Sequence, residues 1–294
     1  DGAGDRSPAA SASDPAGGLD LGRYAVWSGG FVNFGSRNDG GLDLDHTMVG
    51  LSGGIDARFS DDFVFGIGLG YGRDKSEIGG NGTESRAEAY SAAFYGSYNP
   101  FERFFFDGLL GGSWLDFDSR RHVTQNGDLA TGARDGSQLF GSVTAAYEFR
   151  DGASLVSPYG RVDFSRSWLE GFTEEGGGAY ALSYGDQTVD SLSGVLGLRA
   201  SYAIATDWGT LTPGIRAEYT HDFAGSSRID LGYADLDDLA YALETEPTSR
   251  DYATLGLSLD AAFPEDWTAG LDYRTAFGDD RQDHSVGVEV RKGF

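Results

Sequence analysis

The sequence predicts an all-β fold: a single membrane-spanning barrel of twelve antiparallel strands. Three observations support this prediction. Apolar residues alternate strictly with small or polar ones along many segments, which is typical of strands with two different faces. Glycine supplies 46 of the 294 residues, roughly twice its average usage, and 13% of the residues are aromatic. Short and long connections also alternate along the chain.

The alternation defines each strand in turn. Between residues 63 and 72, Phe63, Phe65, Ile67, Leu69 and Tyr71 alternate with valine and glycine. The segments 90–98, 253–263 and 267–274 behave in the same way, with one face continuously apolar or aromatic. Twelve such strands are expected to begin near residues 23, 43, 63, 84, 103, 133, 154, 189, 210, 248, 267 and 283.

The connections indicate the kind of barrel. Those after the second, fourth, sixth, eighth and tenth strands are short, at 61–62, 99–102, 150–152, 205–209 and 264–266. Most of the others are long and polar, at 74–84, 118–133, 170–188 and 225–248. Short periplasmic turns alternating with longer extracellular loops are typical of outer-membrane barrels. An even number of strands places both ends of the barrel on the periplasmic side.

The energetic cost of placing a charge in lipid shows which face of each strand points outward and which points into the pore. A Lys or Arg that faces the mid-bilayer costs roughly 2–4 kcal/mol in a barrel, so the apolar face must be outside and the charged face inside. Eight acids and six bases are thereby predicted to line the pore: Asp56, Arg58, Asp107, Glu148, Arg161, Asp163, Arg199, Arg216, Glu218, Asp260, Asp272, Arg274, Glu289 and Arg291. They either pair with one another along the wall or contact a chain in the pore. Inward glycines at 54, 66, 68, 70 and 256 either leave room for such a chain or relieve crowding in the curved wall. Aromatic residues at the strand ends, such as Trp27, Trp208 and Trp267, are expected to form the two interfacial girdles.

The chain divides into two parts. Residues 1–22 are predicted to be a linker in or near the pore, because Asp1 to Gly18 are rich in Gly, Ala, Ser and Pro and have no aromatic residue. Residues 23–294 are predicted to be one barrel domain. Residues 1–18 also lack the cationic start and apolar run of a signal peptide, so we expect an export signal upstream.

Composition excludes several classes of protein. The net charge of −24 argues against nucleic-acid binding, and the absence of cysteine excludes a disulfide scaffold and a thiol nucleophile. No stretch approaches the roughly 18–20 apolar residues of a membrane helix. The mean hydropathy of −0.34 suits a strand pattern in which one face alone meets lipid.

No catalytic, cofactor or metal site is predicted. The four histidines lack metal-ligand spacing, and His221 is expected to point outward near the extracellular rim, away from the neighbouring Asp222. His284 and Asp283 are related in the same way. The acidic clusters Glu174-Glu175 and 235–238 are expected to be solvated loops, with divalent-cation binding as the alternative.

Several segments together resemble the autotransporter β-domain, the translocator of type V secretion. They are AVW at 25–27, AFYGSY at 93–98, PYGR at 158–161, DSL at 190–192, GLR at 197–199, YTHDF at 219–223 and DHS at 283–285. Their order, their spacing and the terminal Phe294 carry the resemblance, which covers residues 23–294.

The resemblance implies a segment threading the lumen and insertion by the β-barrel assembly machinery, which recognises the last strand. In this sequence the assembly signal would be Val286, Val288, Val290 and Phe294. Lys292 departs from the family pattern, and its long stem would let the ammonium reach the periplasmic interface. Some family members cleave themselves beside an Asn pair in the pore. Residues 1–32 contain no Asn, so no such cleavage is expected.

The sequence therefore predicts a monomeric translocator in the outer membrane of a Gram-negative bacterium, which exports and anchors a passenger attached before Asp1. Expected partners are outer-membrane lipid and lipopolysaccharide, the assembly machinery and the passenger itself, and any enzymatic activity would belong to the passenger. A stand-alone porin or adhesin is the alternative. A barrel-embedded hydrolase, whose activity would be lost on substituting His221, is a third hypothesis.

Overall fold

The computed structural model describes residues 23–294 except 40–41, 224, 237–238, 246–249 and 279–280. Residues 1–22, to which the pore-threading prediction applies, lie outside this part of the chain. Twelve long strands form the barrel. They are β1 (Tyr24–Asp39), β2 (Leu42–Ser60), β3 (Phe63–Ile78), β4 (Thr83–Phe101), β5 (Phe104–His122), β6 (Leu129–Tyr147), β8 (Ser154–Leu169), β12 (Gln187–Tyr202), β14 (Gly209–Asp222), β17 (Asp251–Phe263), β18 (Trp267–Gly278) and β19 (Arg281–Gly293).

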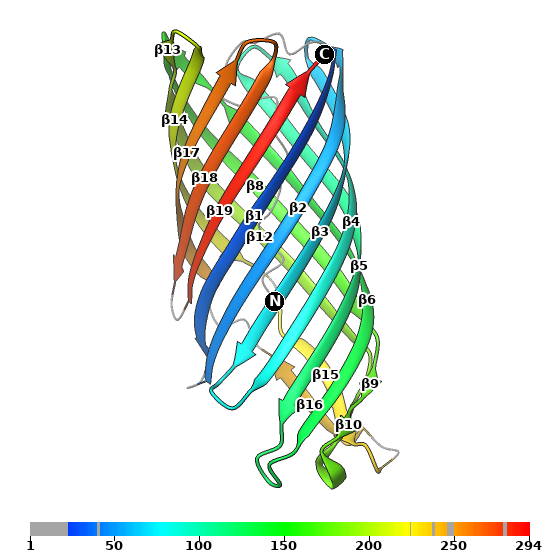
Figure 1. Ribbon diagram of the computed structural model, residues 1–294. Helices are drawn as coiled ribbons and strands as arrows, with labels where there is room; N and C mark the ends of the chain where they lie inside the picture. Colours follow the sequence, from blue (N-terminus) through cyan, green and yellow to red (C-terminus); the bar gives the residue numbers. More distant parts are fainter. Residues whose placement is uncertain (1–22, 40–41, 224, 237–238, 246–249, 279–280) are drawn as a thin grey trace.

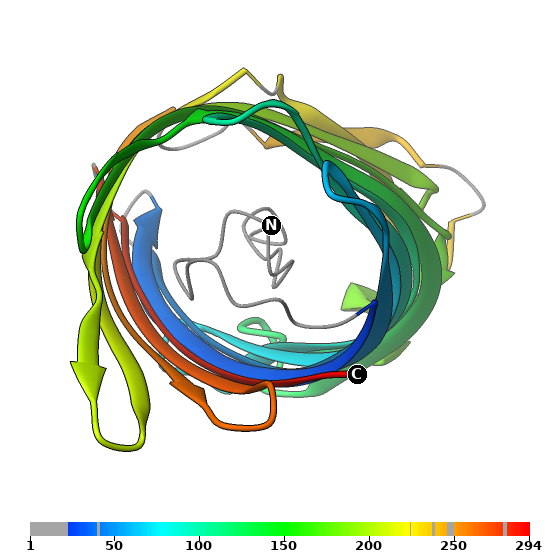
Figure 2. The same cartoon turned by 90° about the horizontal axis from the view of Figure 1, so that it is seen from above.

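The barrel is closed by pairing of its first and last strands. β1 pairs with β19 from Ala25↔Gly293 to Arg37↔Arg281, and with β2 on its other side. β6 pairs directly with β8, so the ring has no open edge there (Figure 2). Closure matters because a strand edge exposed to lipid would leave backbone N–H and C=O groups without partners.

The alternation in the sequence becomes an outer and an inner face. Outward residues such as Leu51, Leu69 and Leu196 are 68–70% exposed, as expected for side chains whose solvent is hydrocarbon. Inward neighbours such as Trp27, Asp56 and Tyr95 are buried. The prediction that Trp27 belongs to an interfacial girdle is therefore wrong, because its indole lies inside the barrel and donates to the Tyr95 hydroxyl. On the outer wall Tyr71 lies against Tyr90, with ring centroids 5.1 Å apart, and Trp114 stands opposite Tyr90 on β5.

The predicted strand starts are confirmed, and the largest difference is at β6, which begins at Leu129 instead of near residue 133. Two predicted long loops are wrong. Residues 74–84 and 118–133 consist largely of strand, and β3 and β4 are separated only by the turn 79–82. Charged side chains made these segments look like loops. They instead form ion pairs within the sheet: Lys75 on β3, Arg120 on β5 and Arg86 on the same strand all lie within 3.6 Å of Glu84 on β4.

Small elements occupy the remaining connections. On the extracellular side, β9 (Phe172–Thr173), β11 (Leu182–Tyr184), β15 (Ser227–Tyr233) and β16 (Tyr241–Thr245) form a second sheet in the order β16-β15-β11-β9. β10 (Glu175–Gly176) pairs with β6 and precedes the 3-10 turn η1 (Gly178–Tyr180). On the periplasmic side, β7 (Phe149–Asp151) and β13 (Ile204–Thr206) make tight hairpins with β8 and β14. No helix in the described part of the chain is long and apolar enough to cross a membrane.

The strands differ in length around the ring. β2, β4, β5 and β6 each have 19 residues, whereas β17 and β19 have 13 and β18 has 12. Since about 9–11 tilted residues cross a bilayer, the long strands continue well beyond it. The wall on their side therefore reaches further toward the extracellular end (Figure 1).

Candidate functional site

The candidate site is the lumen, where a cavity of about 380 Å³ lies along the inner wall. Nine of the fourteen residues predicted to line the pore border this cavity. They are Asp107, Arg161, Asp163, Arg199, Arg216, Asp260, Asp272, Arg274 and Glu289. Of the other five, Asp56, Glu148, Glu218 and Arg291 form ion pairs, and Arg58 is half-buried on β2.

One ion-pair cluster is centred on Glu218 of β14, whose side chain is 1% exposed. Arg161 Nη1 lies 3.3 Å from Glu218 Oε1 and Arg216 Nη1 lies 3.8 Å from it. Arg161 also pairs with Asp163 at 2.7 Å, and the Tyr159 hydroxyl donates a hydrogen bond to Glu218. The cluster therefore joins β8 to β14 across the intervening β12.

A second cluster lies near the periplasmic end. Glu148 is fully buried between Arg150, at 2.5 Å, and Arg199, at 3.5 Å. The short β7 hairpin brings Arg150 to this position, which the sequence pattern did not reveal. Arg274 and Asp272 form a further pair at 3.3 Å on β18.

A third cluster crosses the seam of the barrel. Arg291 of β19 reaches over β1 to Asp56 of β2, with Nη2 2.7 Å from Oδ1. The Tyr95 hydroxyl donates to Asp56 Oδ2 at 3.2 Å and accepts a hydrogen bond from the Trp27 indole at 2.5 Å. Arg58 lies two positions from Asp56 on the same face of β2, close enough to act on its carboxylate electrostatically.

Three of the inward glycines lie directly beneath aromatic rings that pack against their backbone. A Cβ on Gly66 would lie 2.3 Å from the Tyr95 ring, and one on Gly54 would lie 2.8 Å from the Trp27 ring. Gly68 is also under Trp27, at 3.2 Å. The space at these positions is filled by the wall itself, so it is not room for a threaded chain. Gly70 and Gly256 have no such cover, since the nearest atoms lie 3.4 Å or more from a Cβ.

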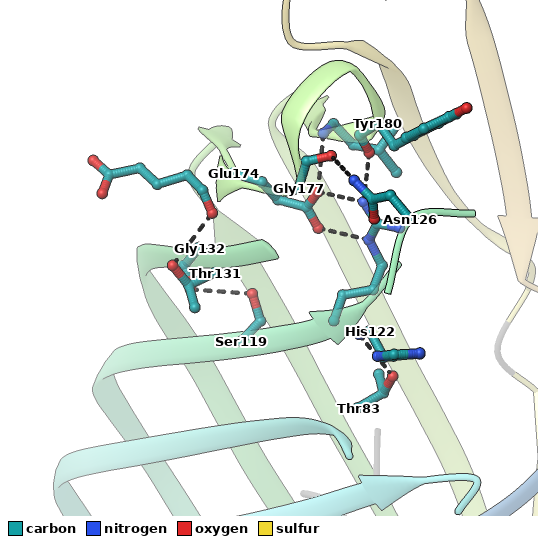
Figure 3. A network of polar contacts seen from close by, with 12 residues as sticks. Thr83, Ser119, His122, Asn126, Thr131, Gly132, Glu174, Gly177 and Tyr180 are labelled. Carbon is teal, nitrogen blue, oxygen red and sulfur yellow. Dashed lines mark hydrogen bonds and ion pairs between the residues drawn. The ribbon is translucent and has the colours of Figure 1, made fainter. Parts of the chain in front are cut away.

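Glu174 is not a solvated loop residue, contrary to the prediction for its cluster. Its side chain is 3% exposed and forms a two-pronged ion pair with Arg121 at the end of β5 (Figure 3). Hydrogen bonds from Arg121 to Glu174 raise the pKa of the guanidinium above its usual range. Glu174 also accepts the Leu182 N–H at 2.9 Å, and Asn126 donates to Gly177 O at 3.1 Å. These contacts fix the 170–188 connection on the extracellular end of β5 and β6.

Two of the histidines have cross-strand partners on the outer wall. His221 points outward, and its Nδ1 lies 2.8 Å from Asp251 Oδ1 on β17, with the Tyr219 hydroxyl on the same carboxylate. His284 Nδ1 lies 2.9 Å from the Tyr273 hydroxyl. Register across strands creates these pairs, so the sequence neighbours Asp222 and Asp283 gave no signal for them. The described residues contain no group of three or more His, Cys, Asp or Glu arranged to hold a metal ion.

The last strand presents its predicted assembly residues outward. Val286, Val288, Val290 and Phe294 are 39–67% exposed on the outer wall. Lys292 lies at the periplasmic end, where its ammonium is 5.6 Å from the ring centroids of both Trp267 and Phe294. It also donates a hydrogen bond to Glu265 O in the β17–β18 turn.

The fold and the lumen define a closed, outward-apolar barrel that encloses a charged channel. The model of the family "Autotransporter beta-domain" matches residues 26–274, so the chain belongs to that family. The barrel resembles the translocator domain of the autotransporter NalP from Neisseria meningitidis, with a TM-score of 0.78 and 18% identity over 92% of this chain and 88% of that one. It also resembles the beta domain of the Bordetella autotransporter BrkA, with a TM-score of 0.73 and 18% identity over 92% and 100% of the two chains. The chain is thus an outer-membrane translocator barrel of the type V secretion class.

Curated relatives are longer than this chain. Esterase EstA of Pseudomonas aeruginosa is 25% identical over 89% of this chain and 42% of its own length. An extracellular serine protease of Serratia marcescens is 25% identical over 92% of this chain and 26% of its own length. The chain therefore spans less than half the length of these relatives.

Proposed function

We propose that this barrel exports a passenger joined to its N-terminal segment and holds it at the cell surface. Residues 1–22 would thread the lumen, and residues 23–294 would form the conduit. The named relatives, an esterase and a protease, support a passenger with its own activity. In this proposal the barrel itself performs no bond chemistry.

The observation that carries the proposal is that the lumenal charges form ion pairs with other side chains of the wall. Most of the ion pairs described above join neighbouring positions along the wall, and the lumenal Glu218 accepts contacts from three side chains. Charges satisfied by the wall hydrate the channel but grip a passing chain weakly. A conduit for a polypeptide needs this combination, because a strongly binding site would stop movement.

The proposal is tested by reversing Arg216, which is 30% exposed and borders the cavity. In the full-length protein with its passenger, Arg216→Glu places a second anion beside Glu218, so we expect passenger surface display to fall several-fold. Display is measured by protease accessibility on whole cells, and folding by the heat-dependent mobility shift of the barrel in gels.

Two controls separate lumenal contact from general damage. The conservative variant Arg216→Lys keeps a cation beside Glu218 and should retain display. Arg120→Glu changes an outward cation on β5 and should leave display unchanged. Unchanged display and pore conductance in both Arg216→Glu and Arg274→Glu would refute the lumenal role.

Membrane insertion is the second part of the proposal. We propose that the β-barrel assembly machinery recognises the outward residues of β19 and that the barrel inserts as a monomer among lipid and lipopolysaccharide. Removing Phe294 should lower the amount of heat-modifiable barrel in cells, whereas Lys292→Ala should not. Equal assembly after loss of Phe294 would show that the signal lies elsewhere.

A further inference from the structure

The outer wall carries an apolar groove that the translocator role does not use. It has a volume of about 470 Å³, within the range of ligand pockets, and it crosses β19, β1, β2 and β3. Gly30 lies at its centre, with Val288 opposite on β19 and Leu51 opposite on β2. Val32, Val49 and Tyr71 complete the sides.

The groove faces hydrocarbon, and this determines what can fill it. Gly30 has no side chain, while its outward neighbours Leu51 and Val288 are 68% and 55% exposed. An empty channel between such side chains would forfeit dispersion contacts, and water is absent from the bilayer core. A lipid acyl chain is the occupant that the surroundings supply.

Cations lie at the extracellular end of the same groove. Arg73 stands opposite Val49, and Lys75 stands opposite the next outward residue of β2, Thr47. Their side chains are 52% and 44% exposed, above the aromatic pair Tyr71–Tyr90. Arg73 is held loosely, since its Nε is 3.9 Å from Glu88 Oε1. Lys75 Nζ lies 2.5 Å from Glu77 Oε1 and 3.6 Å from Glu84 Oε2, so a phosphate would share this ammonium with carboxylates. Arg and Lys are the usual protein donors to phosphate oxygens.

We propose that the groove binds one acyl chain of lipid A, the phosphorylated glycolipid of the outer leaflet, with Arg73 and Lys75 on its phosphate. The apolar groove and the cations lie on the same outward face, one directly above the other along β3 and β2. A phosphate at the opposite, periplasmic leaflet could not reach these cations, which disfavours a periplasmic-leaflet phospholipid as the occupant. The site concerns the outer wall, so it is independent of passenger export through the lumen.

The test compares lipid retained by the purified full chain in native mass spectrometry after mixing with lipid A or with phosphatidylethanolamine. We expect one lipid A per wild-type barrel. Gly30→Val fills the floor of the groove, where a Cβ lies 2.9 Å from the end of the Leu51 side chain. Its matched control is Gly108→Val on β5, which also faces outward and has no atom within 4 Å of its Cβ. Lipid A retention should fall about tenfold in Gly30→Val, because the added side chain takes the space of the acyl chain. It should stay unchanged in Gly108→Val.

A second variant keeps the test decisive even where Gly30→Val folds poorly. Arg73→Gln/Lys75→Gln alters only exposed side chains, and Arg120→Gln is its matched control on the same outer face. The double variant should also lose about tenfold in lipid A retention, equivalent to one charge-assisted hydrogen bond. Wild-type retention in the double variant, or in a folded Gly30→Val barrel, would overturn the proposal. Equal retention of phosphatidylethanolamine and lipid A by the wild-type barrel would overturn it as well.

Discussion

Replacing Asp56 with alanine leaves the Arg291 guanidinium without its carboxylate at the seam of the barrel. The two side chains are 4% and 14% exposed, and the pair bridges the last strand and the second strand across β1. The Tyr95 hydroxyl loses its acceptor at the same time. Asp56→Ala therefore removes a side-chain contact that connects β19 to β2 where the barrel closes.

The magnitude follows from burial. Removing one partner of a buried ion pair costs about 3–5 kcal/mol, because the remaining charge is uncompensated. Arg291 keeps some access to the lumen, so we expect the lower end, about 3 kcal/mol, which is roughly a hundredfold in the unfolding equilibrium. Arg291 and Tyr95 donate to different oxygens of Asp56, so Asp56→Asn keeps an acceptor for one donor at a time and should lose an intermediate amount, about 2 kcal/mol.

The assay is equilibrium unfolding of the barrel in phospholipid vesicles, followed by tryptophan fluorescence over a urea series. Asp56→Ala/Arg291→Met removes both charges and should recover most of the loss, since a neutral apolar pair carries no desolvated ion. A decrease below about 1 kcal/mol for Asp56→Ala would refute the reasoning, because this is the range of exposed ion pairs.

Three further predictions concern other parts of the barrel. Gly197→Val should destabilise the barrel by about 1–3 kcal/mol, because a Cβ there would lie 2.2 Å from the Tyr159 ring, whereas Gly70→Val should have little effect. Hydrogen bonds from Arg166 hold the pKa of the outward Asp190 carboxyl below its ordinary 3.8, so the pair stabilises the extracellular wall above that pH. That contribution should be lost as pH falls through the lowered pKa, and a carboxyl chemical-shift titration should show the pKa return to its ordinary value in Arg166→Gln. The purified barrel should be inert toward ester and peptide substrates.

Each of these predictions has an outcome that contradicts it. Equal unfolding free energies for the two glycine variants would mean that the Tyr159 ring moves aside freely. An Asp190 titration unchanged by Arg166→Gln would show that the ion pair does not form in solution. Hydrolysis by the purified barrel that disappears in His221→Ala would establish the hydrolase hypothesis.

The sequence predicted the strands and their faces, because a two-residue period and the cost of charge in lipid are local properties. It did not predict which residues meet across strands, because the period specifies the face of each residue but not the register. His221 therefore pairs with Asp251, thirty positions away in the sequence, and not with its neighbour Asp222. Glu174 in an acidic run is indistinguishable from a solvated loop residue until Arg121 of β5 is placed beside it. The aromatic covers over Gly54 and Gly66 also depend on register, so glycine on the inner face could be read equally as open space.

The unequal strand lengths give the channel an oblique outlet. With 19 residues in β5 and 12 in β18, the two sides differ by roughly 20 Å measured along the strands. A polypeptide that emerges from the lumen clears the wall first beside β17, β18 and β19, while β4, β5 and β6 still shield its other flank. The extracellular opening is therefore asymmetric, and the emerging chain is exposed to solvent on the side of β17, β18 and β19 before it is exposed on the other side.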